Sequence, residues 1–320
     1  MTALAGILCV MLFGFPPPGQ TGPPKPWQHA VESQTAPGDS THTIVVDGRQ
    51  RTYLAHVPPD YDGHTPLPVV LVFHGGVSNA AFTVRFTGLS EKADQARFLA
   101  VYPSGTGRLS RALTWNAGSC CGYAQHEHVD DVAFVRALLD DLATHFAVDA
   151  RRVYATGISN GGMMAHRVGA ELADRVAAIA SVSGPLQIDA IHPARPVSVM
   201  HFHGTADEFA PFGGGTGAKS LASIHFRSAP DSVAAWVRAD GCEETPKVTA
   251  LPAAAGDPTR VRREAYGPCK NGSQVVFYVI DGGGHAWPGR EPRVQFLGTS
   301  TVSISANDLM WDFFRKHARR

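Results

Sequence analysis

Segments that read as strands alternate with segments that read as helices along most of this chain. The first kind are short apolar runs, and the second kind carry apolar residues at helical spacing. Strands are predicted at 43–46, 51–57, 68–73, 98–102, 152–156, 176–182, 197–203, 247–251, 260–265 and 274–280, and helices at 130–146, 160–172, 231–239 and 304–317. This alternation predicts an α/β fold with a mostly parallel central sheet and helices on both faces.

Composition excludes some classes of protein. The chain has 320 residues, of which 28 are basic and 28 acidic. A nucleic-acid-binding protein needs a basic stripe, so the balanced charge argues against a nucleic-acid partner. Hydrophobic residues make up 44% of the chain, which argues against a disordered chain and provides for a sizeable core.

The N-terminal part of the chain reads as a leader. Residues 3–15 are mostly apolar, and this run is shorter than the roughly 20 residues that a membrane-spanning helix needs. Prolines recur from 16 to 37 and predict an extended spacer. We therefore expect residues 1–40 to be a leader and linker, residues 41–320 to form one folded domain, and the protein to be secreted or periplasmic with no stable membrane span. A flexible cytosolic N-terminus is the alternative, because no charged residue precedes Lys25.

Cysteine usage fits an exported chain. With Cys9 set aside, four cysteines remain, and an even number suggests disulfide bonds. Cys242 and Cys269 are the natural pair, and closing the loop between them would contribute about 3.5 kcal/mol. Adjacent Cys120 and Cys121 leave two states open, a vicinal disulfide and a pair of buried thiols.

The strongest chemical signal is Gly157-Ile158-Ser159-Asn160-Gly161, which joins a predicted strand to a predicted helix. A sharp turn of this kind lifts the serine hydroxyl out of the sheet, and the flanking glycines let strand and helix approach each other. The helix N-terminus then faces the oxyanion that develops on an attacked carbonyl. We therefore predict that Ser159 is a nucleophile.

A serine hydroxyl is a weak nucleophile alone, so a base and an orienting acid are required. In this architecture they follow the serine in the order acid, then histidine. Asp207 comes just after one predicted strand and His285 after another, where open α/β sheets place their sites. Asp207 is the predicted acid, with Glu208 and Asp281 as fallbacks, and His285 is the predicted base.

The oxyanion needs a second donor, which is expected after an early strand. His74-Gly75-Gly76 follows the apolar run that ends at residue 73. We predict that the amides of Gly76 and Asn160 bind the developing charge, each donor being worth about 10²–10³ in turnover. His74 itself is expected to be structural.

Several further motifs accompany these residues. The set comprises His74-Gly75-Gly76, Trp115-Asn116, Cys120-Cys121-Gly122, Val129-Asp130-Asp131-Val132, Gly157 to Gly162, His203-Gly204-Thr205-Ala206-Asp207 and Gly284 to Gly289. Jointly it resembles the polyhydroxybutyrate depolymerase and feruloyl esterase group of α/β-hydrolases, from about residue 41 to the C-terminus. The resemblance implies an α/β-hydrolase fold but no single substrate, because the group includes polyester depolymerases, feruloyl esterases and acetylxylan esterases.

The resemblance also implies roles for particular residues. It implies a triad of Ser159, Asp207 and His285 and a bridge between Cys242 and Cys269. It further implies that the neighbourhoods of two tryptophans line the substrate cleft, Trp115 and Trp287. Depolymerases of solid polymer often append a binding domain, and this chain ends with its closing helix, so we expect soluble or oligomeric esters.

We predict a serine esterase that hydrolyses carboxylic esters through an acyl-enzyme, with short-chain hydroxyalkanoate oligomers as the expected substrates. The prediction includes no cofactor and a monomeric protein. A carbohydrate esterase acting on feruloyl or acetyl groups of xylan is the close alternative. A serine peptidase on the same fold and a non-catalytic binding protein are the more distant ones.

Three other segments resemble cofactor sites and are interpreted differently. Residues 212–220 lack the Gly-Lys-Ser/Thr step of a phosphate loop and read as a mobile loop. Residues 126–128 and 201–203 both have the pattern histidine, any residue, histidine, which suggests zinc, but nothing nominates a third protein ligand. We interpret the first as a solvated loop and the second as a strand end, and we predict no metal.

Overall fold

The computed structural model of this chain describes residues 37–221, 224–290 and 295–319. These residues belong to one compact unit that spans 33–320. The apolar leader and nearly all of the predicted linker, residues 1–36, lie outside the described residues. The first strand begins at Gly38, slightly before the expected start of the folded domain at residue 41.

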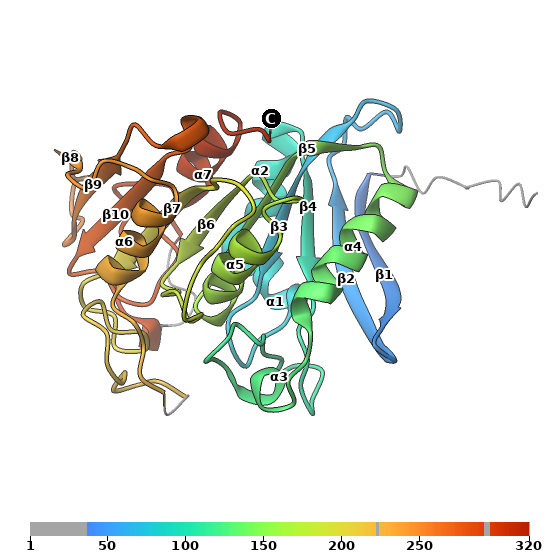
Figure 1. Cartoon of the computed structure of the whole chain (residues 1–320), viewed down its shortest axis with the longest axis horizontal. Coiled ribbons are helices and arrows are strands. Elements are labelled where there is room, and N and C mark those ends of the chain that lie inside the picture. The colour runs from blue at the N-terminus through green and yellow to red at the C-terminus, as the bar shows by residue number, and fades with distance from the viewer. Residues whose placement is uncertain (1–36, 222–223, 291–294, 320) are drawn as a thin grey trace, which may run out of the picture. The chain divides into compact units, whose positions relative to one another are not determined.

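A ten-stranded sheet forms the centre of this unit (Figure 1). Its strands lie in the order β1-β2-β4-β3-β5-β6-β7-β10-β9-β8. The strands are β1 (Gly38–Val46), β2 (Arg49–Val57), β3 (Leu67–Phe73), β4 (Leu99–Pro103), β5 (Val148–Ile158), β6 (Ala178–Val182), β7 (Ser198–Gly204), β8 (Lys247–Ala250), β9 (Arg260–Tyr266) and β10 (Val275–Asp281). All strands from β4 to β10 in this order are parallel, and antiparallel strands complete both edges, so the predicted mostly parallel sheet is confirmed.

The register of the central strands brings their carboxyl ends to one edge. Phe73 at the end of β3 pairs with Gly157 of β5, and Gly157 pairs with Ser181 of β6. The segments that follow these parallel strands therefore leave the sheet side by side. This is the edge at which open α/β sheets build their sites.

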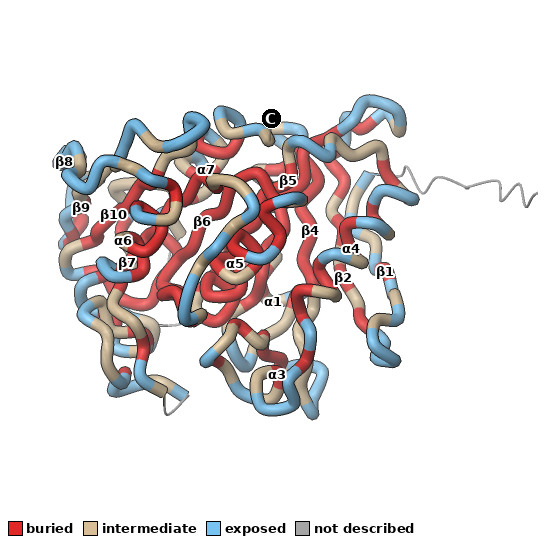
Figure 2. Tube along the Cα trace, in the orientation of Figure 1, coloured by how far each residue is buried: buried red, intermediate tan, exposed pale blue. Residues whose placement is uncertain are grey.

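Two layers of helices cover the sheet, as predicted (Figure 1). Helices α4, α5 and α6 pack on one face, and α1, α2 and α7 pack on the other. Their bounds are α1 (Ala80–Thr87), α2 (Leu89–Ala96), α3 (Gly122–His126), α4 (Asp131–His145), α5 (Asn160–Glu171), α6 (Ala229–Ala239) and α7 (Ala306–Phe314), with short 3-10 turns at Lys270–Gly272 and Gln295–Leu297. Figure 2 shows the central strands as the most continuously buried part of the chain.

The apolar pattern does not predict α1, α2 and α3, and it misplaces the end of β5. Gly88 adopts a left-handed φ of 63°, which ends α1 and begins α2, so neither helix is long enough to display a clear period. Gly157 was expected to break its strand. It instead continues β5 to Ile158, because both neighbouring strands pair with it.

The cysteines pair as the sequence suggests. Cys242 and Cys269 form a disulfide bond that ties the end of α6 to the segment before β10. The sulfur atoms of Cys120 and Cys121 lie in contact across a cis peptide bond, which fits the vicinal-disulfide alternative. Among the described helices, none combines the length and apolarity that crossing a bilayer requires.

A buried carboxyl group at the C-terminus of α6 gives the fold a pH dependence. Asp240 accepts a hydrogen bond at Oδ1 from the Val197 amide (3.0 Å), and the Ser273 side chain also interacts with this carboxyl group. Burial raises the pKa of Asp240 to about 7. The native state therefore keeps a proton that the unfolded chain releases above about pH 4.

We expect Asp240→Asn to remove this contribution. A raised native-state pKa means that stability falls as pH rises from about 4 to about 7, by up to about 1.4 kcal/mol per pH unit, and is constant above. An amide stays neutral throughout. The difference in unfolding free energy between variant and wild type, from urea denaturation at several pH values, should therefore increase in favour of the variant across this window. Parallel pH profiles for the two proteins would contradict the expectation.

Candidate active site

Ser159 lies on the sharp turn between β5 and α5. Its φ of 57° and ψ of −126° are unusual for a residue with a side chain, and its amide donates to the Val182 carbonyl (2.9 Å). A Cβ added at Gly157 would lie 2.6 Å from the Phe73 carbonyl oxygen, and one at Gly161 would lie 2.3 Å from it. The two glycines are therefore required for the strand and the helix to approach each other, as the sequence motif predicts.

Asp207 and His285 meet at the carboxyl end of the sheet. His285 Nδ1 donates to Asp207 Oδ2 at 2.8 Å, and both side chains are almost completely buried. Asp207 Oδ1 accepts from the amides of Phe209 and Ala210, both at 2.9 Å. The carboxylate is thus held at one oxygen by its own loop and aims the other at the imidazole.

The surroundings of Asp207 keep it ionised. Burial alone would favour the protonated acid. The attraction of His285 and its hydrogen bond outweigh burial, and His203 and the Ala210 amide add to them, so the pKa of Asp207 lies below its usual value. An ionised Asp207 is the form that can orient and stabilise an imidazolium.

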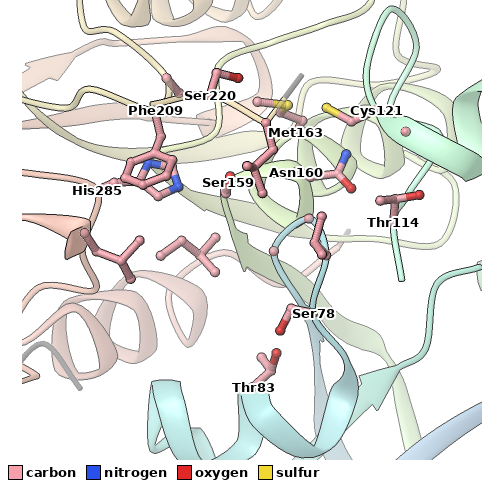
Figure 3. Close-up of a pocket in the computed structure, with 18 of the residues that line it drawn as sticks. Ser78, Thr83, Thr114, Cys121, Ser159, Asn160, Met163, Phe209, Ser220 and His285 are labelled. Carbon is pink, nitrogen blue, oxygen red and sulfur yellow. The ribbon is translucent and has the colours of Figure 1, made fainter. Parts of the chain in front are cut away.

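Ser159 and His285 line the same cleft, whose volume is about 430 Å³ (Figure 3). In the figure Ser159 lies between His285 and Asn160. No hydrogen bond joins the Ser159 hydroxyl to His285 within the described residues. Catalytic hydrogen bonds are often long in ligand-free enzymes and tighten when substrate binds, so this geometry is compatible with a nucleophile and its base.

Asn160 lies on the opposite side of Ser159 from His285 (Figure 3), and Gly76 is its neighbour. A Cβ built at Gly76 would lie 3.6 Å from the Cβ of Asn160, so the two segments are in contact. Asn160 is the first residue of α5, where a backbone N–H has no partner within the helix. Both residues line the cleft beside Ser159.

His74 is structural, as expected. Its Nδ1 donates to the Gly75 carbonyl (2.7 Å), and its Nε2 accepts from the Gly105 amide (2.9 Å). Burial lowers the pKa of His74 to about 4, so the ring is neutral. It fixes the glycine-rich loop that carries Gly76.

The neighbourhoods of Trp115 and Trp287 contribute Thr114 and His285 to the cleft, but the two tryptophan rings themselves do not line it. Both are fully buried and absent from the residues that line it. The Trp115 amide donates to Asn160 Oδ1 (2.7 Å), and the Trp287 indole donates to Asn307 Oδ1 (2.8 Å). Trp115 therefore holds Asn160 in place and Trp287 anchors the segment that follows His285, and the buried rings do not contact the cleft.

The fallback acids are engaged elsewhere. Glu208 pairs with Lys219 (2.5 Å), within the glycine-rich loop that resembles a phosphate site, and Asp281 pairs with Arg262 (3.1 Å). Neither carboxylate contacts His285 among the described hydrogen bonds. Asp207 is the acidic residue that the fold brings to the imidazole.

Within the described residues one group of side chains has the composition of a metal site, and it lies away from the cleft. Ligand atoms of His42, Asp141 and His145 lie within 4.8 Å of one another. Tyr53 donates to Asp141 (2.6 Å) and Ser40 bonds to His42 (2.9 Å), so two of the three already have protein partners. The Tyr53–Asp141 bond joins β2 to α4, and the Ser40–His42 bond lies within β1.

The sequence pattern misses the apolar lining of the cleft. Five phenylalanines contribute to it: Phe82, Phe86, Phe209, Phe226 and Phe296. The first two lie on α1, which the pattern does not predict, Phe209 and Phe226 lie in loops, and Phe296 lies in the 3-10 turn Gln295–Leu297. At the mouth of the cleft, Val77, Leu221 and Phe296 are exposed by 52%, 81% and 61% and form what we call the apolar rim.

The parallel sheet, the helices on both faces and the serine turn define an α/β-hydrolase. Residues 45–248 match the family described as "Putative esterase", and the chain belongs to that family. The chain is therefore a carboxylic ester hydrolase of the feruloyl esterase type of α/β-hydrolases.

Individual relatives agree with this membership. The "Putative esterase NocK" of Nocardia uniformis subsp. tsuyamanensis is 34% identical, over 93% of this chain and 91% of that protein. "Feruloyl esterase B" of Piromyces equi is 29% identical over 74% of this chain, and the match spans 42% of that protein's length. The solved structure of the acetyl xylan esterase from Aspergillus awamori has a TM-score of 0.58 and 16% identity, covering 86% of this chain and 99% of that one, and it supports the fold alone.

Proposed function

We propose that this chain hydrolyses carboxylic esters with Ser159 as nucleophile, His285 as general base and Asp207 as the orienting acid. The observation that carries the proposal is the hydrogen bond between His285 and Asp207 beside the cleft that Ser159 lines. The position of Ser159 on a strand-to-helix turn supports it, because that turn exposes a hydroxyl next to the N-terminus of α5.

The reaction follows from these positions. His285 Nε2 takes the proton of the Ser159 hydroxyl as its oxygen attacks the ester carbonyl, and the amides of Gly76 and Asn160 donate to the oxyanion. His285 returns the proton to the leaving alcohol, which leaves an acyl-serine. Water then repeats the sequence with His285 as base, and it releases the acid and restores Ser159.

The lining of the cleft favours esters with an apolar acyl group. Short-chain hydroxyalkanoate oligomers are the first candidate, because the apolar rim widens the cleft mouth with side chains that suit a repeating aliphatic ester. The phenylalanine rings favour a second candidate, a feruloyl ester, whose aromatic acyl group would stack on them. We further propose that the protein is secreted or periplasmic, in keeping with the Cys242–Cys269 bond, and that it acts as a monomer.

A fluorophosphonate probe and a substrate panel test the two levels of the proposal. The probe should label the purified protein, and mass spectrometry should place the adduct on Ser159. Values of kcat/KM should then be compared for hydroxybutyrate oligomers, methyl ferulate and acetylated xylan. We expect either of the first two to exceed acetylated xylan by about tenfold or more, since burial of each extra CH₂ contributes about 0.8 kcal/mol. A preference for acetylated xylan would contradict the apolar-acyl assignment, and labelling elsewhere would contradict the nucleophile.

A further inference from the structure

A chain of buried rings runs through the core behind the candidate triad. It begins at Trp236 on α6, passes through His166 on α5, and continues through two alternate residues of β7, His201 and His203. The successive distances are 2.9 Å from Trp236 Nε1 to His166 Nδ1, 3.3 Å from His166 Nε2 to His201 Nδ1, and 3.1 Å from His201 Nε2 to His203 Nδ1. All four side chains are buried.

The hydrogen bonds of this chain have one possible direction. At its far end, His203 Nε2 lies 2.7 Å from the Ala210 carbonyl oxygen, which can only accept, so His203 carries its proton on Nε2. A neutral His203 must then accept at Nδ1 from His201, and His201 must accept at Nδ1 from His166. At the near end the Trp236 indole can only donate, so His166 also accepts at Nδ1. The two ends independently demand the same tautomer of all three histidines.

Burial keeps these histidines neutral. It lowers the pKa of His166 to about 3 and lowers those of His201 and His203 as well, although Asp207 partly opposes the effect at His203. A ring that stays neutral has a fixed dipole and one N–H to place. The hydrogen-bonded rings therefore hold the N–H of His203 in a fixed position, and they do not carry a charge.

The N–H of His203 contacts the loop that carries Asp207, the candidate acid. His203 Nε2 lies 3.5 Å from Asp207 Oδ2, the oxygen that also accepts from His285. It donates more closely to the carbonyl of Ala210, whose amide in turn donates to Asp207 Oδ1. His203 thus contacts the loop from residue 207 to 210 at both ends.

The same loop contacts His285 a second time. The ring of Phe209 packs against the imidazole of His285 with centroids 5.1 Å apart (Figure 3). A shift of the loop would therefore move both the carboxylate and the aromatic ring that fix the orientation of His285. Among the described residues of β7, His203 is the one whose side chain contacts the Asp207 carboxylate. The contacts from the loop itself come from backbone amides.

We propose that His203 is a positioning residue for Asp207. The three rings that precede it fix the tautomer in which the Nε2–H of His203 points at the Asp207 loop; they are those of Trp236, His166 and His201. This inference rests on the proposed function, in which Asp207 orients His285. His203 touches no reacting atom. It holds the acid and its loop where the imidazole needs them.

Two substitutions at one position separate positioning from packing. His203→Leu removes the N–H that the Ala210 carbonyl accepts, and we expect kcat for p-nitrophenyl butyrate to fall by about 10- to 100-fold with KM changed less than about threefold, the range expected when a buried acceptor is left without its donor. His203→Gln places an amide N–H near the position of Nε2 and should restore kcat to within about threefold of wild type. Wild-type kcat in His203→Leu, or failure of a folded His203→Gln to recover it, would overturn the proposal.

Phe202→Leu is the matched control. Phe202 is equally buried on the same strand, but it packs on the opposite face of the sheet. It should cost stability comparable to that lost in His203→Leu while leaving kcat within about threefold of wild type. An equal loss of kcat in both variants would show that general destabilisation, and not positioning, is responsible.

The tautomers can be observed directly in the unmodified protein. In ¹⁵N-histidine-labelled enzyme, we expect the signals of all three histidines to report a proton on Nε2 and none on Nδ1, unchanged from about pH 5 to 9. A Nδ1–H form or titration of any of the three in this range would overturn the proposal, even if the variants fail to fold. A failure of the proposed function has a different signature, because Ser159→Ala would then remain active whatever the histidines show.

Discussion

Replacing Ser159 by alanine is expected to lower kcat for p-nitrophenyl butyrate by about 10³-fold or more. The candidate mechanism forms its covalent bond at this oxygen, and removal of a nucleophile leaves only the contribution of the oxyanion donors and of binding. Alanine keeps the Cβ that the left-handed φ of 57° already accommodates, so the backbone strain at the turn is unchanged. Steady-state kinetics and a thermal melt of the same preparation make the measurement.

Ser110→Ala provides the matched control. Ser110 is exposed and does not line the cleft, so the same chemical change there should leave kcat within about twofold of wild type. If Ser159→Ala retained more than about a tenth of the activity while remaining folded, Ser159 would not be the nucleophile.

Replacing Asp131 by alanine is expected to cost about 3–5 kcal/mol of unfolding free energy. Asp131 and Arg51 form an ion pair at 2.7 Å, with exposed side-chain fractions of 0% and 3%. Its loss would leave the buried guanidinium without a counter-ion, which is the costly way to break such a pair. Asp131 also accepts from the Asn116 amide (2.8 Å). Its loss would therefore remove a partner both from Arg51 on β2 and from the segment at Asn116, whose neighbour Trp115 bonds to Asn160. Urea denaturation monitored by fluorescence gives the free energy.

Two comparisons isolate the effect of burial on this pair. Asp174→Ala breaks the exposed ion pair with Arg136, whose side chains are about half exposed, and should cost less than about 1 kcal/mol. The double variant Arg51→Met with Asp131→Leu replaces both charges by apolar groups and should be more stable than Asp131→Ala alone. Equal losses for Asp131→Ala and Asp174→Ala would show that the buried pair has no special role.

The sequence pattern predicts the sheet well because a strand buried on both faces leaves a local signature. The continuous apolar run at 68–73 corresponds to β3, the strand predicted at 197–203 corresponds to β7, and the Asp47-Gly48 turn of the first hairpin has the positive φ values that such a turn needs. The same pattern fails to predict a strand where pairing with a neighbouring strand, and not the local sequence, determines the conformation. The first part of β5 is polar, and its strand conformation at Val148 depends on pairing with Leu67.

The positions of the candidate site residues could also be predicted, because each follows a strand that ends at one edge of the sheet. Side-chain direction could not. Trp115 and Trp287 belong to motifs beside the cleft, yet their rings point into the core, where packing determines their orientation. The pair His201 and His203 was interpreted only as a strand end. The contact of His201 with His166 joins residues 35 positions apart in the chain, and a local pattern does not contain such a contact.

The apolar rim has a consequence for which esters the enzyme binds. Val77, Leu221 and Phe296 face water when the protein is free in solution. Contact with the aliphatic part of an oligomeric ester would release the water that surrounds them, and this favours binding at the cleft mouth. Among soluble esters, one that extends beyond the cleft over these three side chains should therefore bind more tightly than one that ends inside it.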